Sequence, residues 1–354
     1  MPISNDKIEK ISYEVIKILY KKFDDFPIDT STNRNAPFHT AFLNAFSDKL
    51  GEKVADIPFF ISLSSWLQGL NTTLGQTFFE KTAHILSDGE KREYTSRKLG
   101  NLKINQTQKN IINTIVTDLS SSNRSPNSEE EEKLLLQTDG NLEVNAIDFS
   151  ADVFIEDADQ IIAIELKSVR PNSGEMRGEK HKILEAKAAL QKKFPNKKIF
   201  FFLGFPFDPT QSENPTGYDK NRFIKSNINL DKFFAKDEFL LADELWDRLS
   251  SQSSTMTKLL GIINQVATPS FLNDFRFLNK PENKFTDKAK YKKILNCWNL
   301  FSELKLVNNE ELIKQIILNN PKHNRQFNQL IFNKDGEYNA GRFNYLDNLL
   351  PKNP

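Results

Sequence analysis

Residues 149–167 read FSADVFIEDADQIIAIELK, and this stretch decides the fold of the chain. Its first half has the two-residue periodicity and the β-branched and aromatic side chains of a strand. The second half begins with four apolar residues, 161–164, which are typical of a short strand covered on both faces. The tight loop 157–160 between the halves predicts an antiparallel pair of strands.

The segments that follow this hairpin add a helix and a third strand. Residues 175–194 carry apolar positions at helical spacing, and Pro195 with Asn196 ends the pattern. Residues 199–203 read IFFFL, which indicates another short buried strand. The order strand, strand, helix, strand predicts a small mixed sheet with a crossover helix, and therefore an α/β (α+β) fold.

Helical patterns flank this core on both sides. They cover residues 5–25, 58–70, 76–86 and 104–119 before the core and 237–250, 254–266 and 287–306 after it. The predicted organisation is a helical N-terminal part (1–127), a core (128–220) and a helical C-terminal part (221–354), with the polar run 120–128 as the best linker candidate. One continuous domain is the alternative.

Composition excludes several classes of protein. The chain has 354 residues, 38% of them hydrophobic and 27% charged, which is typical of a soluble globular protein. Its single cysteine, Cys297, excludes an intramolecular disulfide framework and a four-cysteine zinc site. No stretch approaches the roughly 20 apolar residues of a membrane helix, and the N-terminus lacks the pattern of a signal peptide, so we expect a cytoplasmic protein.

Chemistry is indicated most strongly by Asp152, Glu165 and Lys167. Glu165 and Lys167 lie two residues apart, so their side chains share one face of their strand. If Glu156 faces Ile161 across the hairpin, the register places Asp152 opposite Glu165. Two carboxylates and an ammonium group would then meet at one point.

Such a cluster suits a hard divalent cation, because Mg²⁺ prefers oxygen ligands and often binds one or two carboxylates plus waters and phosphate. A bound metal lowers the pKa of a water and neutralises charge at an attacked phosphorus. Lys167 could orient that water and stabilise the developing negative charge. The alternative is that the three residues decorate an exposed strand face. The buried character of 161–164 argues against it, since stray charges are costly there.

A basic segment follows the acidic strand directly. Residues 167–198 hold ten basic and three acidic residues, a local excess of seven positive charges on a chain whose formal net charge is +1. We expect the part nearest the cluster to contact DNA phosphates or base edges, through Arg170, Asn172, Arg177, Lys180 and Lys182. For the distal lysines a solvated helix face is the simpler interpretation. The net charge of the whole chain, +1, is near neutral, and we expect this to limit indiscriminate binding to DNA.

Asp152 with Glu165-Leu166-Lys167 resembles the PD-(D/E)xK nuclease motif, with Ala151 where the motif's name has proline. Residues 65–71 (SWLQGLN) and 74–80 (LGQTFFE) resemble type II restriction endonucleases of the TdeIII type, and the similarity covers most of the chain except the loosely matched helices after residue 221. The resemblance implies a restriction-endonuclease-like fold and Mg²⁺-dependent cleavage of double-stranded DNA. The product would carry 5′-phosphate and 3′-hydroxyl ends.

The resemblance also assigns roles. Asp152 and Glu165 would hold the metal with the Leu166 carbonyl, and Lys167 would position the water. Glu80 is a secondary candidate for the metal site, because related nucleases use a helix glutamate shortly after a glycine; the alternative is a solvated turn after Phe78 and Phe79. Asp148, four residues before Asp152 on the same strand face, is a rival to Asp152. A homodimer would align two sites on a short palindrome, for which the TdeIII resemblance implies the GGNCC type, and a cognate methyltransferase would protect host DNA.

Two other functions remain open at this point. A repair or junction-resolving nuclease of the same fold would cut by DNA structure instead of sequence. A non-catalytic DNA-binding protein would carry the acids as decoration. The histidines have no metal-ligand spacing and are interpreted as structural or surface residues, although His181 lies near enough to contact DNA, and Cys297 is expected to be packed.

Overall fold

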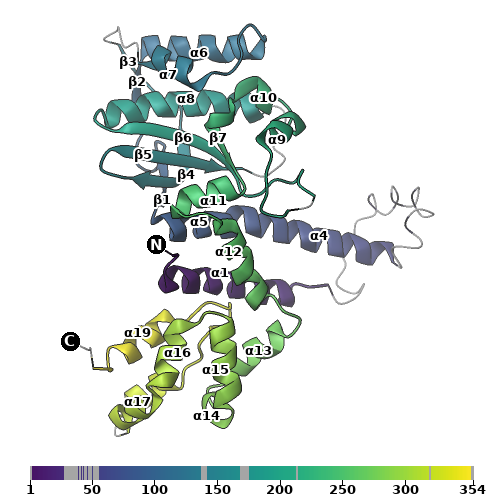
Figure 1. Cartoon of the computed structure of the whole chain (residues 1–354), viewed down its shortest axis with the longest axis vertical. Helices are drawn as coiled ribbons and strands as arrows, with labels where there is room; N and C mark the ends of the chain where they lie inside the picture. Colours follow the sequence, from purple (N-terminus) through teal and green to yellow (C-terminus); the bar gives the residue numbers. More distant parts are fainter. Residues whose placement is uncertain are drawn as a thin grey trace. The chain divides into compact units, whose positions relative to one another are not determined.

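The computed structural model describes residues 2–27, 56–136, 142–167, 175–212, 214–318 and 320–351, with five isolated positions between 39 and 50. The chain divides into two compact units (Figure 1). Unit 1 comprises Met1–Ile3 and Phe79–Leu259, and unit 2 comprises Ser4–Phe78 and Leu260–Pro354. None of the described helices combines the length and the apolar character that crossing a membrane requires.

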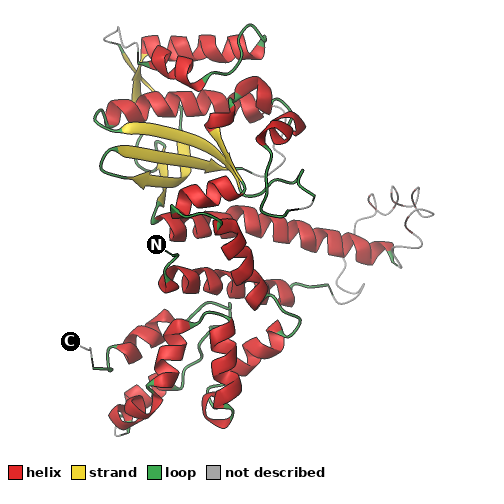
Figure 2. Ribbon diagram, viewed as in Figure 1, coloured by secondary structure: helices red, strands yellow, loops and turns green. Residues whose placement is uncertain are grey.

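Unit 1 is built on a five-stranded sheet in the order β1-β4-β5-β6-β7 (Figure 2). Its strands are β1 (Glu90–Tyr94), β4 (Phe149–Glu156), β5 (Gln160–Leu166), β6 (Lys198–Phe205) and β7 (Phe239–Leu241). The β1–β4 and β4–β5 pairs are antiparallel, whereas β5–β6 and β6–β7 are parallel. The predicted α/β class, with a small mixed sheet flanked by helices, is therefore confirmed. Strands β2 (Lys103–Asn105) and β3 (Glu143–Asn145) form a separate antiparallel pair.

The sheet is covered on both faces. Helix α8 (Glu175–Lys193) connects β5 to β6 and packs on the sheet at β6, with α6 (Gln106–Ser120) lying on α8. Helix α5 (Phe79–Ser87) contacts β4, and α11 (Asp243–Ser250) contacts both α5 and β7. Figure 1 shows the two groups of helices on opposite sides of the sheet. Residues 161–165 of β5 are all buried, because this central strand has helices above and below it.

The remaining helices of unit 1 are short. They are α7 (Ser128–Leu135), α9 (Lys220–Ser226), α10 (Leu230–Phe233), the 3₁₀ turn η4 (Lys236–Glu238) and α12 (Thr255–Val266), which continues into unit 2. The predicted helix 237–250 is wrong in its first part, which contains η4 and β7 before α11 begins. Strand β7 reads FLL, and three apolar residues have no periodicity that separates strand from helix.

Unit 2 brings the first helix against the last part of the chain. Its helices are α1 (Asn5–Asp24), α4 (Ile57–Thr73), the π-helical turn η3 (Leu74–Phe78), α13 (Phe271–Leu278), α14 (Asn283–Thr286), α15 (Lys288–Cys297), α16 (Phe301–Asn308), α17 (Glu310–Ile317), α18 (Pro321–Phe327) and α19 (Ala340–Asp347). Glu9 of α1 accepts hydrogen bonds from the amide (2.7 Å) and hydroxyl (2.6 Å) of Ser302. Tyr13 stacks on Tyr338 with ring centroids 4.0 Å apart.

One predicted helix of unit 2 is two helices. The predicted helix 287–306 is interrupted between α15 and α16, where Asn299 has a left-handed backbone (φ 56°). Asparagine tolerates this conformation better than most residues, and it ends the first helix. Cys297, at the end of α15, is exposed, so the expectation that it is packed is wrong.

The two units do not follow the three predicted parts of the chain. The polar run 120–128 connects α6 to α7 within unit 1, so it separates no compact units. Residues 79–127 belong to the unit that holds the sheet, and so do residues 221–259. Helices from both flanks are therefore needed to cover the sheet.

Candidate active site

The hairpin of β4 and β5 brings Asp152 and Glu165 together. Glu156 pairs with Ile161 and Val153 with Ile164, so the predicted register is confirmed, and one further step places Asp152 opposite Glu165. The amide of Leu166 donates a hydrogen bond of 2.9 Å to Asp152 Oδ2. This bond holds the Asp152 carboxylate at the end of β5.

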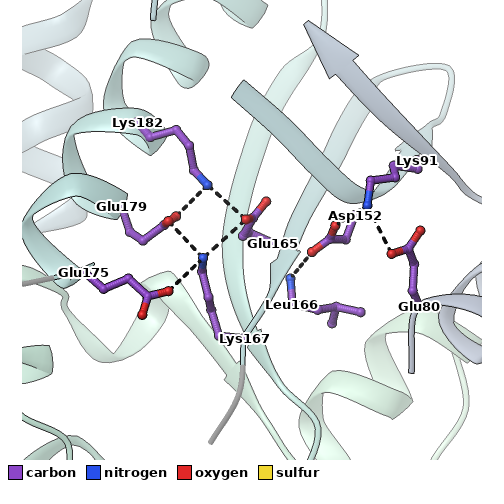
Figure 3. Close-up of polar contacts among 9 residues, drawn as sticks. All are labelled: Glu80, Lys91, Asp152, Glu165, Leu166, Lys167, Glu175, Glu179 and Lys182. Carbon is purple, nitrogen blue, oxygen red and sulfur yellow. Dashed lines mark hydrogen bonds and ion pairs between the residues drawn. The ribbon is translucent and has the colours of Figure 1, made fainter. Parts of the chain in front are cut away.

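Lys167 lies among three carboxylates (Figure 3). Its ammonium is 3.3 Å from Glu165 Oε1, 3.3 Å from Glu175 Oε1 and 2.9 Å from Glu179 Oε1. Its main-chain amide donates to the Gly204 carbonyl at 2.9 Å, which continues the β5–β6 ladder. The ladder fixes the backbone, and the acids fix the side chain over Glu165.

Lys182 extends this cluster from the next turn of α8. Its ammonium lies 2.9 Å from Glu165 Oε1 and 2.7 Å from Glu179 Oε2. Glu165 and Glu179 are therefore each bonded to the same two lysines. This places Lys182 beside the carboxylates of the site, whereas we had expected it on a DNA-binding surface.

Glu80, on α5, is linked to Asp152 by Lys91, a residue that the sequence did not indicate. Lys91 of β1 lies 3.2 Å from Glu80 Oε2 and 3.0 Å from Asp152 Oδ1. Strand β1 reads EKREY, and this charged sequence has no strand signature, so neither the strand nor its lysine was expected. Figure 3 shows the ammonium of Lys91 between the two carboxylates.

His84 supports Asp152 from the same helix. Its Nε2 is 2.6 Å from the backbone carbonyl oxygen of Asp152, and it lies one helical turn after Glu80. This agrees with the interpretation of His84 as structural. Helix α5 thus supports Asp152 through two residues. Glu80 shares Lys91 with the Asp152 carboxylate, and His84 contacts the Asp152 backbone carbonyl.

The site has more acidic than basic groups. Figure 3 gathers five carboxylates, those of Glu80, Asp152, Glu165, Glu175 and Glu179, with three lysines. Two negative charges are therefore in excess, which matches the charge of one divalent cation.

Burial and charge act on the pKa values of two central groups. Burial raises the pKa of Glu165, and the negative charge of Asp152 adds to this, while Lys182 and Lys167 oppose it. Burial lowers the pKa of Lys167, but its acidic neighbours, Glu165 first, more than offset this and raise the pKa overall. Lys167 is therefore an ammonium at neutral pH, which suits a residue that donates hydrogen bonds and not one that accepts a proton.

The donor set fits a hard metal ion held by few protein ligands. Oε2 of Glu165 is buried without a hydrogen-bond partner, so it is an oxygen that a cation could use. Within the described part of the chain, no three His, Cys, Asp or Glu side chains form a ready metal cage. Two carboxylates, a backbone carbonyl, waters and a substrate phosphate are the usual environment of Mg²⁺, which avoids all-protein cages.

The rival acid lies elsewhere. Asp148 precedes β4, is exposed, and accepts a hydrogen bond from the side-chain amide of Asn101. The bond from the Leu166 amide goes to Asp152 instead. The geometry therefore favours Asp152 as the acid of the cluster.

The five predicted DNA-contacting residues differ in their surroundings, and Lys182, described above, lies beside the carboxylates of the site. Arg177 is exposed on α8, and Arg170 and Asn172 lie outside the described residues. Lys180 is fully buried and lies 2.6 Å from both Glu131 and Glu238. The prediction that Lys180 contacts DNA is wrong, because a buried ammonium held by two carboxylates does not reach a phosphate backbone. His181 bonds Glu185 at 2.9 Å.

The mixed sheet, its crossover helix and the acid–acid–lysine cluster at the end of the central strand define a nuclease of the restriction-endonuclease-like fold. The family model described as "Type II restriction endonuclease, HinfI" matches residues 3–267, so the chain belongs to this family of type II restriction endonucleases. The chain is also 45% identical to the type II restriction enzyme MjaII of Methanocaldococcus jannaschii, over 97% of this chain and 96% of that protein. No solved structure matches.

Family membership decides between the functions left open by the sequence. The chain is a site-specific deoxyribonuclease, a hydrolase, which sets aside the structure-specific nuclease and the non-catalytic DNA-binding protein. The expected resemblance to type II restriction endonucleases is confirmed. The TdeIII subtype stays a prediction, since the matching family carries another description.

Proposed function

We propose that Asp152, Glu165 and the Leu166 carbonyl hold Mg²⁺, with Glu80 as an additional ligand, and that Lys167 acts on the attacking water. The observation that carries this proposal is the convergence of three side chains at the end of β5: Asp152 accepts the Leu166 amide at 2.9 Å, and the Lys167 ammonium lies 3.3 Å from Glu165. When bound, Mg²⁺ supplies a water of lowered pKa and neutralises charge on the phosphate.

The residues of the chain orient the reaction. Lys167 donates hydrogen bonds to the water and to the phosphate oxygen on which negative charge develops. Glu179 and Glu175 hold the Lys167 ammonium beside Glu165 before DNA binds. Because the ammonium has three N–H donors, two of them turn from these acids to the water and the phosphate when the substrate is in place. The attacking water loses one proton to solvent as its oxygen bonds to phosphorus, the bond from phosphorus to the 3′ oxygen breaks, and that oxygen takes a proton from solvent. The products carry 5′-phosphate and 3′-hydroxyl ends.

The proposal is tested by digestion of a sequenced plasmid with Mg²⁺ and by mapping of the cut ends. We expect discrete fragments with 5′-phosphates from the unaltered enzyme and none from Asp152→Asn. Cleavage retained by Asp152→Asn would refute the proposed metal site. The matched control is Asp148→Asn, which removes the rival carboxylate and should leave the fragment pattern unchanged.

We further propose a target of the GGNCC type. Support for it comes from the resemblance of residues 65–71 and 74–80 to TdeIII-type enzymes. A plasmid with known GGNCC sites should give fragments whose lengths equal the distances between the sites, and a plasmid from which they have been removed should stay uncut. Fragments with any other common end sequence would replace this target.

A palindromic target favours a homodimer. The described residues of each chain form one such cluster, and the two strands of a palindrome are related by a two-fold axis, so two copies of the chain would cut both strands. Light scattering of the enzyme on a target duplex should give twice the chain mass of 40.8 kDa plus the duplex. We also infer a cytoplasmic location and a cognate methyltransferase, whose modification of the target should block digestion.

A further inference from the structure

Lys91 occupies the position of a cation between two carboxylates of the site. Its ammonium is 3.0 Å from Asp152 Oδ1 and 3.2 Å from Glu80 Oε2. The three residues come from β1, β4 and α5, so the contact depends on the folded arrangement of three separate elements (Figure 3). The proposed cleavage mechanism does not use Lys91.

We propose that Lys91 is a resident counter-cation, which competes with the divalent metal ion for Asp152 and Glu80 and leaves when the ion binds. This inference rests on the proposed metal site. Oδ2 of Asp152 already accepts the Leu166 amide, so Oδ1 is the oxygen that the main chain leaves available. Lys91 donates to that oxygen at 3.0 Å, and a divalent ion bound at Oδ1 would repel the nearby ammonium, which favours its withdrawal.

The surroundings of Lys91 allow this movement. Its side chain keeps 38% of its surface exposed, compared with 12% for Lys167, which is enclosed by acids. Lys91 therefore has a route to solvent, whereas Lys167 does not. Without a metal, Asp152 and Glu80 would repel, and the Lys91 ammonium offsets that repulsion.

Competition of this kind lowers the apparent affinity for the metal. The ion binds the fraction of molecules in which the ammonium is withdrawn, and the observed dissociation constant rises accordingly. Removing the ammonium while keeping the length of the side chain should make binding tighter. This direction is opposite to that expected of a residue that helps to hold the ion.

Calorimetric titration of the full chain with Ca²⁺, without DNA, tests the inference. Lys91→Met should bind Ca²⁺ roughly tenfold or more tightly than the unaltered protein, because a charge-assisted hydrogen bond no longer competes. The matched control is Lys98→Met, which removes an exposed lysine 3.5 Å from Glu93 and should leave the affinity unchanged. Equal or weaker binding by Lys91→Met would overturn the inference.

A third variant separates this inference from the proposed function. Asp152→Asn should weaken Ca²⁺ binding if the proposed metal site is correct. If Asp152→Asn weakens binding and Lys91→Met does not tighten it, the metal site stands and the role of Lys91 fails. If Asp152→Asn binds Ca²⁺ as the unaltered protein does, the proposed metal site itself fails.

A measurement on the unaltered protein covers the case in which Lys91→Met does not fold. Acetylation by an N-hydroxysuccinimide ester, followed by mass spectrometry of peptides, reports how freely each lysine reacts. Addition of Ca²⁺ should raise the labelling rate of Lys91 several-fold and leave that of Lys98 unchanged. An unchanged or slower rate at Lys91 would show that the ammonium stays in place.

Discussion

Lys167 is held in place by three carboxylates and not by a single ion pair. Glu165 precedes it by two residues, and Glu175 and Glu179 reach it from the first turns of α8. Because Glu179 also bonds Lys182, the acids and lysines form one network at the junction of β5 and α8. Hydrogen bonds in such a network depend on each other, so we expect a single substitution to disturb several of them.

Replacing Lys167 by Ala should abolish cleavage and preserve the fold. We expect kcat to fall by at least about 10²-fold, which is typical for the loss of one donor to a developing oxyanion. Ca²⁺-supported DNA binding, measured by fluorescence anisotropy, should stay near that of the unaltered enzyme. The control Lys198→Ala removes an exposed lysine at the start of β6 and should keep full activity. Magnesium-dependent cleavage by Lys167→Ala at a rate near that of the unaltered enzyme would contradict the mechanism.

Lys284 of unit 2 predicts a pH dependence of stability. It is buried, donates a 2.7 Å hydrogen bond to the Phe327 carbonyl and lies 3.5 Å from the centroid of the Phe327 ring. Burial, aided by the charge of Arg342, lowers its pKa to about 7, against about 10.4 in an unfolded chain. Between these values the unfolded state binds the proton more strongly, so the free energy of unfolding rises with pH by up to about 1.4 kcal/mol per unit.

The measurement is thermal unfolding of the unaltered protein and of Lys284→Met across pH 6.5 to 10, as a difference at each pH. The unaltered protein should gain stability relative to the variant as the pH rises through this window. Below pH 7 the difference should level off, because both states then bind the proton. A difference that is flat over the whole range would contradict the lowered pKa.

At the scale of elements, the β4–β5 hairpin and α8 could be predicted from sequence because their signals are local. The four apolar residues 161–164 and the short loop before them fix the register, and the register alone brings Asp152 to Glu165. Strand β1 could not be predicted from its sequence, because its residues are mostly charged. The segment becomes a strand by pairing with β4. For the same reason Lys91 could not be predicted, because its role depends on its contacts with Glu80 and Asp152, which the fold brings together.

Gly204 is a close-approach position between β6 and β5. A Cβ added there would lie 2.8 Å from Ile164 Cγ2 and 3.0 Å from Leu166 Cδ2. The carbonyl of Gly204 also accepts a hydrogen bond from the Lys167 amide, so Gly204→Ala should displace the end of β5. We expect a loss of about 1–3 kcal/mol in the free energy of unfolding, as for other overpacked cores, together with reduced cleavage.

Chemical denaturation with a DNA-cleavage assay checks this prediction. Gly178→Ala is the matched control, because a Cβ on that α8 residue meets no atom within 4 Å and alanine favours the helix. The control should unfold at the same denaturant concentration or slightly higher. Gly204→Ala with unchanged stability and activity would show that the strands can separate without cost.

At the scale of the whole molecule, the charge read from the sequence differs from the charge at the surface. The basic run 167–198 suggested a DNA-binding surface, but many of its lysines are paired with acids from distant segments. Lys180 bonds Glu131 and Glu238, Lys192 bonds Glu143, and Lys197 bonds Glu156. Such pairing could not be predicted, because it depends on which helices and strands meet.

Unit 2 joins the first described helix to residues near the end of the chain. Glu9 has 6% of its surface exposed and accepts both Ser302 bonds at the first turn of α16. Glu9→Ala should lower the free energy of unfolding by about 2–3 kcal/mol, since two hydrogen bonds to a carboxylate are lost and the Ser302 amide and hydroxyl lose their partner. Chemical denaturation measures this loss. Glu311→Ala, an exposed control in the same unit, should change stability by less than about 0.5 kcal/mol.

Unit 2 is made of two segments that are far apart in the sequence, and this sets the order in which the two units can assemble during synthesis. Residues 79–259 leave the ribosome as one uninterrupted segment and can assemble unit 1 from neighbouring sequence. Helix α1 is synthesised before unit 1, yet its partners Ser302 and Tyr338 follow roughly 300 residues later, a delay on the order of tens of seconds at about 5–20 residues per second. The segment that carries Asp152, Glu165 and Lys167 is therefore complete before α1 meets its partners in unit 2.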